Sequence, residues 1–351
     1  MSVAALNRLF AFVFFNSTIV ICWIAYHFYQ PVLFEKYDLQ EASYFFNISQ
    51  PIIFLLIPPV SGIIADRFFS EGSNNFLVFT IGVAAASLLF FISAFVFLDS
   101  TPLFLKKLIP VAMIFWLIAM NLFYTPAADF VVSKAGKEEL LLIMAGISCS
   151  TNLLYVLSDQ LVSLITNFGS VLTFMGAGIV LLFSSYLFFK SIKNSPVSSS
   201  FADFEKINKF NYIILIGLFC GLLEYLTSVM LNKSLQTFLE FESTLIYGIS
   251  VSLFVIPITL MMPKDKLKKT IKISFLAATC LLSAHFLLPA NSIFNFILIL
   301  LLAVTASILS VTALPFALNF SQNKHSNFSC GLFLASFVFP AICIEFIFKL
   351  L

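Results

Sequence analysis

The sequence predicts an all-α polytopic membrane protein with about eleven transmembrane helices, within a range of ten to twelve. Hydrophobic residues make up 60% of the 351 residues and charged residues only 10%, whereas a soluble domain is roughly 45–50% apolar and about 25% charged. The 45 phenylalanines cannot be hidden in one water-soluble core. This excludes a soluble enzyme, a nucleic-acid binder and a disordered chain. Apolar runs such as Phe294–Val304 are continuous, which excludes the alternating pattern of a β-barrel.

The predicted spans follow one another with short loops, because each crossing needs about 20 mostly apolar residues. Arg8 precedes a first stretch that is long enough to span, and no small-residue cleavage site stands out after it. The N-terminus is therefore expected to be a first helix and not a removed signal peptide. The spans are expected near residues 7–29, 42–64, 76–98, 108–128, 140–163, 169–189, 210–231, 243–262, 271–288, 292–318 and 328–350.

The longest polar interruption divides the chain into two parts. Residues 190–209 are expected to be a cytoplasmic linker between an N-terminal six-helix half, residues 1–189, and a C-terminal half of about five helices, residues 210–351. A charged turn follows the second helix of each half, which suggests a weak internal repeat. Such repeats are common in transporters, although any cytoplasmic loop of a membrane protein tends to be basic.

Basic residues predict the orientation, because Lys and Arg are retained on the cytoplasmic side. Most of the 19 fall on the same side as the N-terminus when the predicted spans are counted in order. The N-terminus is therefore expected in the cytoplasm, in a multi-pass protein of a cell membrane, specifically a bacterial inner membrane. The six cysteines lie in apolar runs without a CxxC pair, so they are expected to be core residues and not metal ligands.

The stretch Pro58–Arg67 resembles the signature between helices 2 and 3 of the major facilitator superfamily. Gly62, Asp66 and Arg67 match that pattern, in which the Gly allows close helix packing and the Asp can cap or pair at the cytoplasmic helix ends. The basic residues that follow in the family are replaced here by Phe69-Ser70-Glu71. The resemblance implies a cytoplasmic gate made of Gly62, Asp66 and Arg67. It also implies a twelve-helix fold from which a peripheral helix is missing.

Two further stretches resemble the glycoside and sucrose–cation symporter branch of this superfamily. They are Asn121–Pro126, similar to a helix 4 pattern, and Thr312–Leu318, similar to helix 10. The branch has an Arg and an acid where this chain has Ala128 and Ser133. The antiporter signature of helix 5, a Gly-rich run with Gly-Pro, is absent from the sequence between residues 143 and 162, which favours uptake or symport over drug–proton exchange.

Asp159 is the first candidate for proton coupling, because ionisable groups inside the bilayer are costly and are usually functional. Ser148, Asn152, Tyr155 and Asp159 are spaced 4, 3 and 4 residues apart, which places them on one helix face. Such a polar stripe suits the wall of a water-filled cavity, where a carboxylate can bind and release a proton. The alternative is that Asp159 lies at the outer end of its helix and simply faces water.

Glu224 is the second candidate, on a helix face with Gly217, Gly221 and Ser228. Small residues beside an acid allow close packing or the approach of a substrate. In the family that the chain resembles, this helix lines the central cavity, so Glu224 is expected to bind a proton or the substrate. A structural hydrogen bond to a neighbouring helix is the alternative.

Three uncharged or weakly basic residues complete the candidate site. His27 titrates in the physiological range, but it lies where aromatic and amphipathic side chains anchor helices at the membrane interface, and we favour this anchor role. Asn121 and Tyr124 precede Pro126 in the fourth span and are candidates for cavity groups.

The sequence therefore predicts a secondary transporter that moves a small polar organic solute (sugar-, nucleoside- or amino-acid-like) by alternating access in proton symport. The expected partners are the small-molecule substrate, H⁺ and the lipid bilayer, with no nucleic acid and no cofactor, and the expected state is a monomer. No phosphate loop, HExxH or GxSxG motif is present in the sequence, so neither an ATP-driven pump nor an enzyme is expected. Two alternatives stay open: efflux of a siderophore, drug or metabolite, and a transport-inactive receptor or membrane partner.

Overall fold

The computed structural model describes residues 3–70, 76–98, 102–135, 137–193, 208–234, 243–262, 267–287 and 292–350. Within these ranges every regular element is a helix. Eleven of the described helices are long and apolar enough to cross a membrane. The predicted all-α polytopic class is thereby confirmed. Most of the predicted linker, residues 194–207, lies outside the described residues.

The helices follow the order of the predicted spans, with two short additions. Their bounds are α1 (Val3–Lys36), α2 (Gln40–Ser70), α3 (Leu77–Val96), α4 (Leu103–Lys106), α5 (Ile109–Lys134), α6 (Lys137–Val156), α7 (Ser158–Lys193), α8 (Phe210–Ser234), α9 (Ser243–Met261), α10 (Leu267–Leu287), α11 (Ser292–Leu318), the 3₁₀ helix η2 (Asn323–His325) and α12 (Ser326–Leu350).

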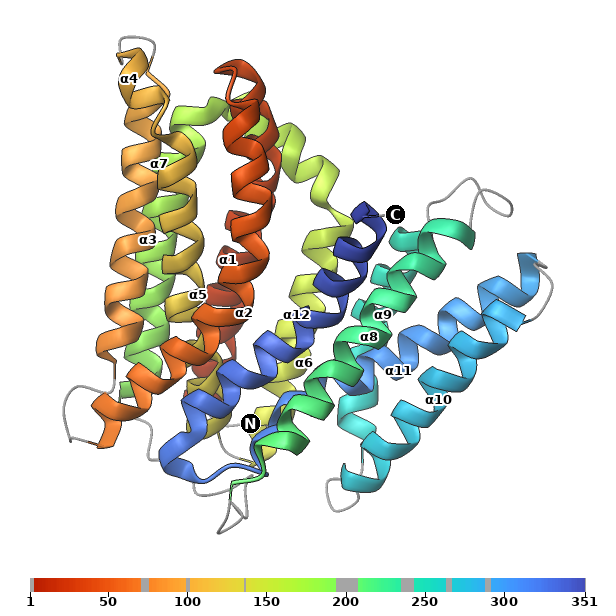
Figure 1. Ribbon diagram of the computed structural model, residues 1–351. Helices are drawn as coiled ribbons and strands as arrows, with labels where there is room; N and C mark the ends of the chain where they lie inside the picture. Colours follow the sequence, from red (N-terminus) through yellow and green to blue (C-terminus); the bar gives the residue numbers. More distant parts are fainter. Residues whose placement is uncertain are drawn as a thin grey trace.

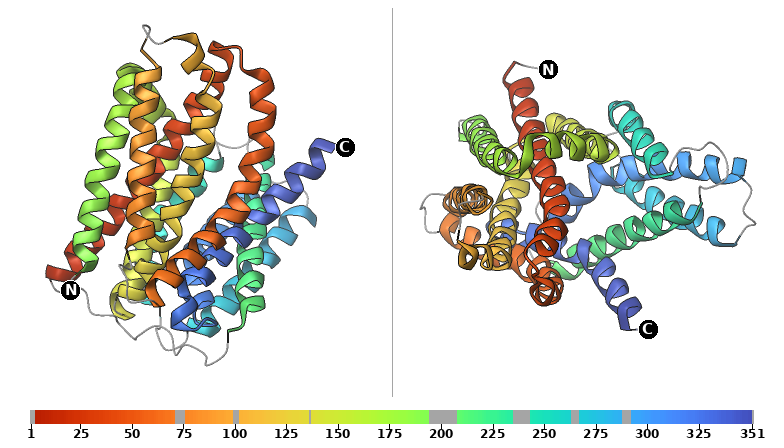
Figure 2. Two further views of the ribbon diagram at one scale, coloured as in Figure 1. Left: turned by 60° about the vertical axis from the view of Figure 1, so that its left-hand side comes forward. Right: turned by 90° about the horizontal axis from the view of Figure 1, so that it is seen from above.

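The helices form two groups that meet along α6 and α12. Helix α1 packs against α6 and α7, and α3 packs against α5 and α7, whereas α11 packs against α9 and α10. Between the groups, α12 lies against both α2 and α8, and α6 lies against both α1 and α9. Figure 1 shows the first group at the left and the second leaning to the right, with the N-terminus at the lower end where the groups converge. The view from above in Figure 2 shows the same separation.

A cluster of phenylalanines holds the first group together. The ring centroids of Phe12 and Phe188 are 4.9 Å apart and those of Phe15 and Phe188 are 4.7 Å apart. Phe123 lies against Phe15 at 5.9 Å, in the tilted geometry that the ring quadrupoles prefer. These rings come from three helices, so the many aromatic residues of the sequence serve helix–helix packing here.

An ion pair joins α1 to α6 near the N-terminal end of the molecule. The Nη2 of Arg8 lies 2.7 Å and 2.8 Å from the two carboxylate oxygens of Glu139, and its Nε lies 3.1 Å from Oε2. Such a forked arrangement fixes direction as well as distance. It sets the register of α1 against α6.

Helix α7 differs from the prediction in its start and in its path. The spans expected at 140–163 and 169–189 correspond to α6, which ends at Val156, and to α7, which begins at Ser158. Gly169 breaks α7 with φ 75° and ψ 164°. Residues 158–168 therefore form a separate segment, which runs across the end remote from the N-terminus in Figure 1. The Tyr29 hydroxyl donates a hydrogen bond to the carbonyl of Ile165 at 3.4 Å and holds this segment against α1.

We expect Gly169→Ala to lower the stability of the protein by about 1–3 kcal/mol, because this backbone conformation is essentially restricted to glycine. Space is not the reason, since a Cβ at Gly169 would meet nothing within 4 Å. The matched control is Gly176→Ala, where a Cβ also meets nothing within 4 Å and the backbone is helical. The control should be neutral or stabilising by roughly 0.5–1 kcal/mol. Thermal unfolding of both purified variants measures the difference, and equal midpoints would refute the backbone argument.

Candidate functional site

The carboxylate of Asp66, near the end of α2, receives the N-terminus of α12. Its Oδ2 accepts a hydrogen bond from the backbone N–H of Phe328 at 2.8 Å. Its Oδ1 accepts from the backbone N–H of Asn327 at 3.1 Å and from the Asn327 side-chain amide at 3.0 Å. The first amides of a helix have no partner within the helix, and a negative charge there is favourable. Asp66 therefore caps a helix that lies 261 residues away in the chain.

A second buried acid holds the same helix end. The Ser326 hydroxyl donates a hydrogen bond to Oδ1 of Asp129, which lies on α5. Asp129 and Ser326 are each only 4% exposed. Two helices of the first group, α2 and α5, are thus tied to the first turn of α12.

Two glycines allow the backbones of α2 and α12 to touch. A Cβ at Gly62 would overlap the carbonyl oxygen of Asn327, and a Cβ at Gly331 would overlap the carbonyl oxygen of Pro58. Any larger residue at either position would separate the helices. Arg67, the third residue of the predicted gate, is exposed. The donors to the Asp66 carboxylate given above come from α12 and not from Arg67. We call the contact formed by Gly62, Asp66, Asp129, Ser326 and Gly331 with their partners the α12 lock.

Small polar side chains are hydrogen-bonded nearer the middle of the helices, and the bond from α6 to α11 joins the two groups. Ser148 on α6 donates a hydrogen bond to Ser310 on α11 at 2.9 Å, and Asn16 on α1 donates to the Thr151 hydroxyl at 2.8 Å. Asn152 donates to the carbonyl of Ser148 within its own helix at 2.9 Å. Uncharged groups that are bonded in this way are inexpensive in a membrane interior.

The two candidate tyrosines lie near each other on α5 and α6. Tyr124 is 36% exposed and Tyr155 is 53% exposed, and their phenol groups are within electrostatic range of one another. Asn121 behaves differently, because it is only 7% exposed and its amide donates to the carbonyl of Leu117 in its own helix at 2.9 Å. The structure therefore brings Tyr124 and Tyr155 together and turns Asn121 into the packed side of α5.

Glu224 lies in the middle of α8 with a side chain that the rest of the protein leaves exposed. No other Asp, Glu, Lys or Arg of the described spans lies as far from both helix ends. Its carboxylate is within electrostatic range of Tyr247 on α9. Within the part of the chain that the structure describes, no hydrogen-bond or ion-pair partner of this carboxylate is found.

Gly217 and Gly221, on the same face of α8 as Glu224, contact α12. A Cβ at Gly221 would overlap the carbonyl oxygen of Phe337, and one at Gly217 would lie 2.8 Å from the carbonyl oxygen of Phe333. The small residues that the sequence places beside the acid thus serve close helix packing. Glu224 follows these contacts by one turn.

Asp159 is not part of the stripe that its spacing suggests. It lies in the first turn of α7, beyond the end of α6 at Val156, and is exposed. Ser148, Asn152 and Tyr155 remain together on α6. The helix is interrupted at Leu157, and the ribbon changes direction between α6 and the start of α7 (Figure 1).

His27 is exposed and lies among aromatic rings of α1. Its ring is stacked on that of Trp23 at a centroid distance of 5.8 Å and lies edge-on to Tyr26 at 5.6 Å. Across the ranges given above, no group of three or more His, Cys, Asp or Glu side chains could hold a metal ion.

Asp129 and Ser326 are the functional candidates that sequence reasoning missed. Asp129 follows Pro126 in the fourth span, out of register with the family pattern, and Ser326 lies in a polar loop. A signal existed for Asp129, which is an acid within a span, five residues before the last residue of its helix at Lys134. Nothing in the sequence pairs it with a serine 197 residues further on.

We expect Gly62→Ala to open the α12 lock, because the new methyl group would overlap the backbone of α12. Overpacking destabilises a packed contact by about 1–3 kcal/mol. A destabilisation of this size raises the population of molecules with an open lock roughly tenfold. The readout is the rate at which N-ethylmaleimide labels Cys330, which is 0% exposed beside Gly331.

Two controls accompany this measurement. Cys22 is 1% exposed in the core of the first group and should stay unlabelled unless the variant unfolds. In Gly146→Ala the new methyl would meet only side-chain tips of Val13 and Leu9, so Cys330 should react as in the unmodified protein. Unchanged labelling of Cys330 in Gly62→Ala would show that the lock does not close this end.

The fold is similar to that of two solved transporter structures. By sequence, the chain matches no family model and no curated protein. By structure, it is similar to the human organic anion transporter MFSD10 (TETRAN), with TM-score 0.64 and 12% identity over 95% of this chain and 90% of the other. It is also similar to a bacterial homologue of the iron transporter ferroportin in an outward-facing state, with TM-score 0.68 and 13% identity over 98% of this chain and 91% of the other. The predicted fold, a major-facilitator-like two-half helical bundle, is confirmed, and the glycoside symporter branch gains no support from these comparisons.

Proposed function

We propose that the protein is a secondary transporter that moves a small polar organic solute, neutral or positively charged, by alternating access. The observation that carries the proposal is the α12 lock, which joins the two groups of helices through hydrogen bonds at one end. Each hydrogen bond of this kind stabilises the closed state by a few kcal/mol at most. A substrate with differential affinity for the two states can therefore shift the equilibrium between them.

The units that move are the N-terminal half, residues 1–189, and the C-terminal half, residues 210–351, joined by residues 190–209. With the N-terminus in the cytoplasm, the lock closes the cytoplasmic end and the other end is the open one. Similarity to a transporter in an outward-facing state supports this conformation. The proposal places the chain as a monomer in a bacterial inner membrane.

The charges support a neutral or cationic substrate. In the described spans the basic residues lie at helix ends, and Glu224 is the ionisable group nearest a helix centre. An anionic solute would find no basic partner near that level among these residues, while a sugar, a nucleoside or an amine would find the tyrosines, serines and one carboxylate. The organic anion named for MFSD10 is therefore not the substrate class that we propose here.

Glu224 is the better candidate for the coupling proton. A carboxylate in the middle of a span, without a partner among the described residues, can exchange a proton with the cavity or bind a positive group. Asp159 lies at an exposed helix end, where its protonation would have less influence on the closing of the two halves. We therefore propose proton symport with Glu224 as the coupling residue and Asp159 as the second candidate.

We expect Glu224→Gln to abolish uphill accumulation while sparing exchange down a gradient, and Asp159→Asn to retain both. A thermal-shift screen of sugars, nucleosides, amino acids and amines first identifies a substrate; a ligand at 100 times its Kd adds about 2.7 kcal/mol of stability. Proteoliposomes with an imposed pH gradient then measure accumulation and exchange of that substrate.

The outcomes of this experiment distinguish the two acids as coupling residues, and transport from a receptor role. Normal accumulation by Glu224→Gln together with loss in Asp159→Asn would move the coupling role to Asp159. Normal accumulation by both variants would refute proton coupling through either acid. A protein that no member of the panel stabilises, and that transports none of them, would favour the receptor interpretation over transport.

A further inference from the structure

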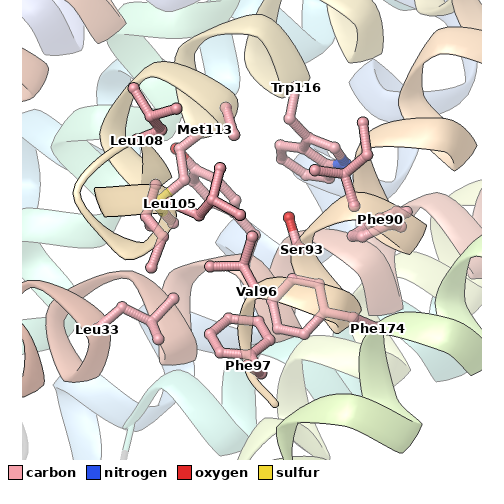
Figure 3. A pocket seen from close by; sticks show the side chains of 14 residues that line it. Leu33, Phe90, Ser93, Val96, Phe97, Leu105, Leu108, Met113, Trp116 and Phe174 are labelled. Atoms are coloured by element: carbon pink, nitrogen blue, oxygen red, sulfur yellow. The ribbon is translucent and has the colours of Figure 1, made fainter. Parts of the chain in front are cut away.

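A small apolar pocket lies within the first group of helices, away from the α12 lock. It has a volume of about 100 Å³ and is lined by residues of α1, α3, α4, α5 and α7. Figure 3 shows Leu33, Leu105 and Leu108 on one side of it and Phe90 and Trp116 on the other. An apolar cavity of roughly 150 Å³ can hold benzene. This pocket has about two thirds of that volume, which leaves room for a few methylene groups at the end of one hydrocarbon chain.

The leucine side of the pocket reaches the outer surface of the bundle. Leu105 is 40% exposed and Leu108 is 43% exposed, whereas Phe90 and Trp116 are 1% and 4% exposed. The pocket therefore runs from a mouth at Leu105 and Leu108 to a buried floor at Phe90 and Trp116. In a membrane-spanning bundle the surface around such a mouth faces lipid.

Two lysines meet at this mouth. Tyr37 follows Leu33 by one turn of α1, and its N–H donates a hydrogen bond to the Leu33 carbonyl at 3.1 Å. The Nζ atoms of Lys36 and Lys106 each lie 5.6 Å from the centre of the Tyr37 ring. Lys106 is the neighbour of Leu105 in the chain and Lys36 follows Leu33 by three residues, so both lysines belong to chain segments that line the pocket.

Acidic residues share this corner with the lysines. Glu35 and Asp38 flank Lys36 and Tyr37 in the chain, and both are exposed. The corner thus carries both signs of charge at a helix end. This suits a headgroup with a phosphate and an amine better than it suits a purely anionic one.

We propose that this pocket is a binding site for one phospholipid of the phosphatidylethanolamine type. The end of one acyl chain occupies the pocket, and the phosphate lies between Lys36 and Lys106 beside Tyr37. The amine of the headgroup lies toward Glu35 and Asp38. The site is independent of the transport proposal, because it uses no residue of the α12 lock and none of the cavity candidates.

Trp116 at the floor of the pocket provides the test. The chain contains two tryptophans, and Trp23→Phe leaves Trp116 as the sole reporter. The protein in dodecyl maltoside is titrated with phosphatidylethanolamine brominated near the chain end, and quenching of Trp116 fluorescence is followed. The same titration with brominated diacylglycerol tests the chain alone, and inorganic phosphate tests the headgroup anion alone.

We expect the phospholipid to quench at a mole fraction on the order of tenfold lower than diacylglycerol does, since each lysine near a headgroup contributes appreciably. In the Trp23→Phe background, the double variant Lys36→Ala/Lys106→Ala should remove this difference, and the control Lys107→Ala should keep it.

Ala112→Phe fills the pocket and should abolish quenching by both lipids. Its control is Val111→Phe, at a residue that is 48% exposed and does not line the pocket. Inorganic phosphate should neither quench nor compete.

Three results would overturn the proposal. Equal quenching by phospholipid and diacylglycerol would show that the headgroup does not contribute to binding. Competition by inorganic phosphate at the concentration of the lipid would identify a free anion as the ligand. Quenching in Ala112→Phe equal to that in Val111→Phe would show that the bromine reaches Trp116 without entering the pocket. Unfolding midpoints of all variants establish that a lost signal is not a lost fold.

Discussion

Three donors at the start of α12 meet the carboxylate of Asp66 at the end of α2, where both groups are buried. The contact satisfies helix amides that have no partner within their own helix, and it requires the backbones of the two helices to touch at Gly62 and Gly331. The crossing of α2 and α12 follows from this requirement. Because α12 also packs on α8, this contact also positions the second group of helices against the first.

Most of the helical framework could be predicted from the sequence, because the bilayer leaves the backbone few choices. A run of about 20 apolar residues must satisfy its own hydrogen bonds, so it becomes a helix. Asp66 and Gly62 could be singled out as well, since the stretch Pro58–Arg67 resembles a known family signature. The cost of burying charge makes Glu224 a candidate, because a carboxylate in the middle of α8 would be costly without a role.

The partners of these residues could not be predicted, because they depend on which helices cross. Asp129 and Ser326 are separated by 197 residues, and neither has a local pattern that points to the other. Asp159 lies apart from the stripe that its spacing suggests. Its spacing from Tyr155 indicates a shared face only if the helix continues, and the chain turns at Leu157 instead. The buried amide of Asn121 bonds within its own helix, and a sequence pattern does not distinguish such an amide from one that faces a cavity.

The segment of residues 158–168 connects α6, which packs on α9 and α11, with the remainder of α7, which packs on α1 and α3. As a helix it spans roughly 1.5 Å per residue, whereas an extended chain spans up to about 3.3–3.6 Å per residue. Its length can therefore more than double if its turns unwind beyond the break at Gly169. The segment is a covalent tether with reserve length, so α6 and the remainder of α7 can shift relative to each other within the N-terminal half while the chain between them stays continuous.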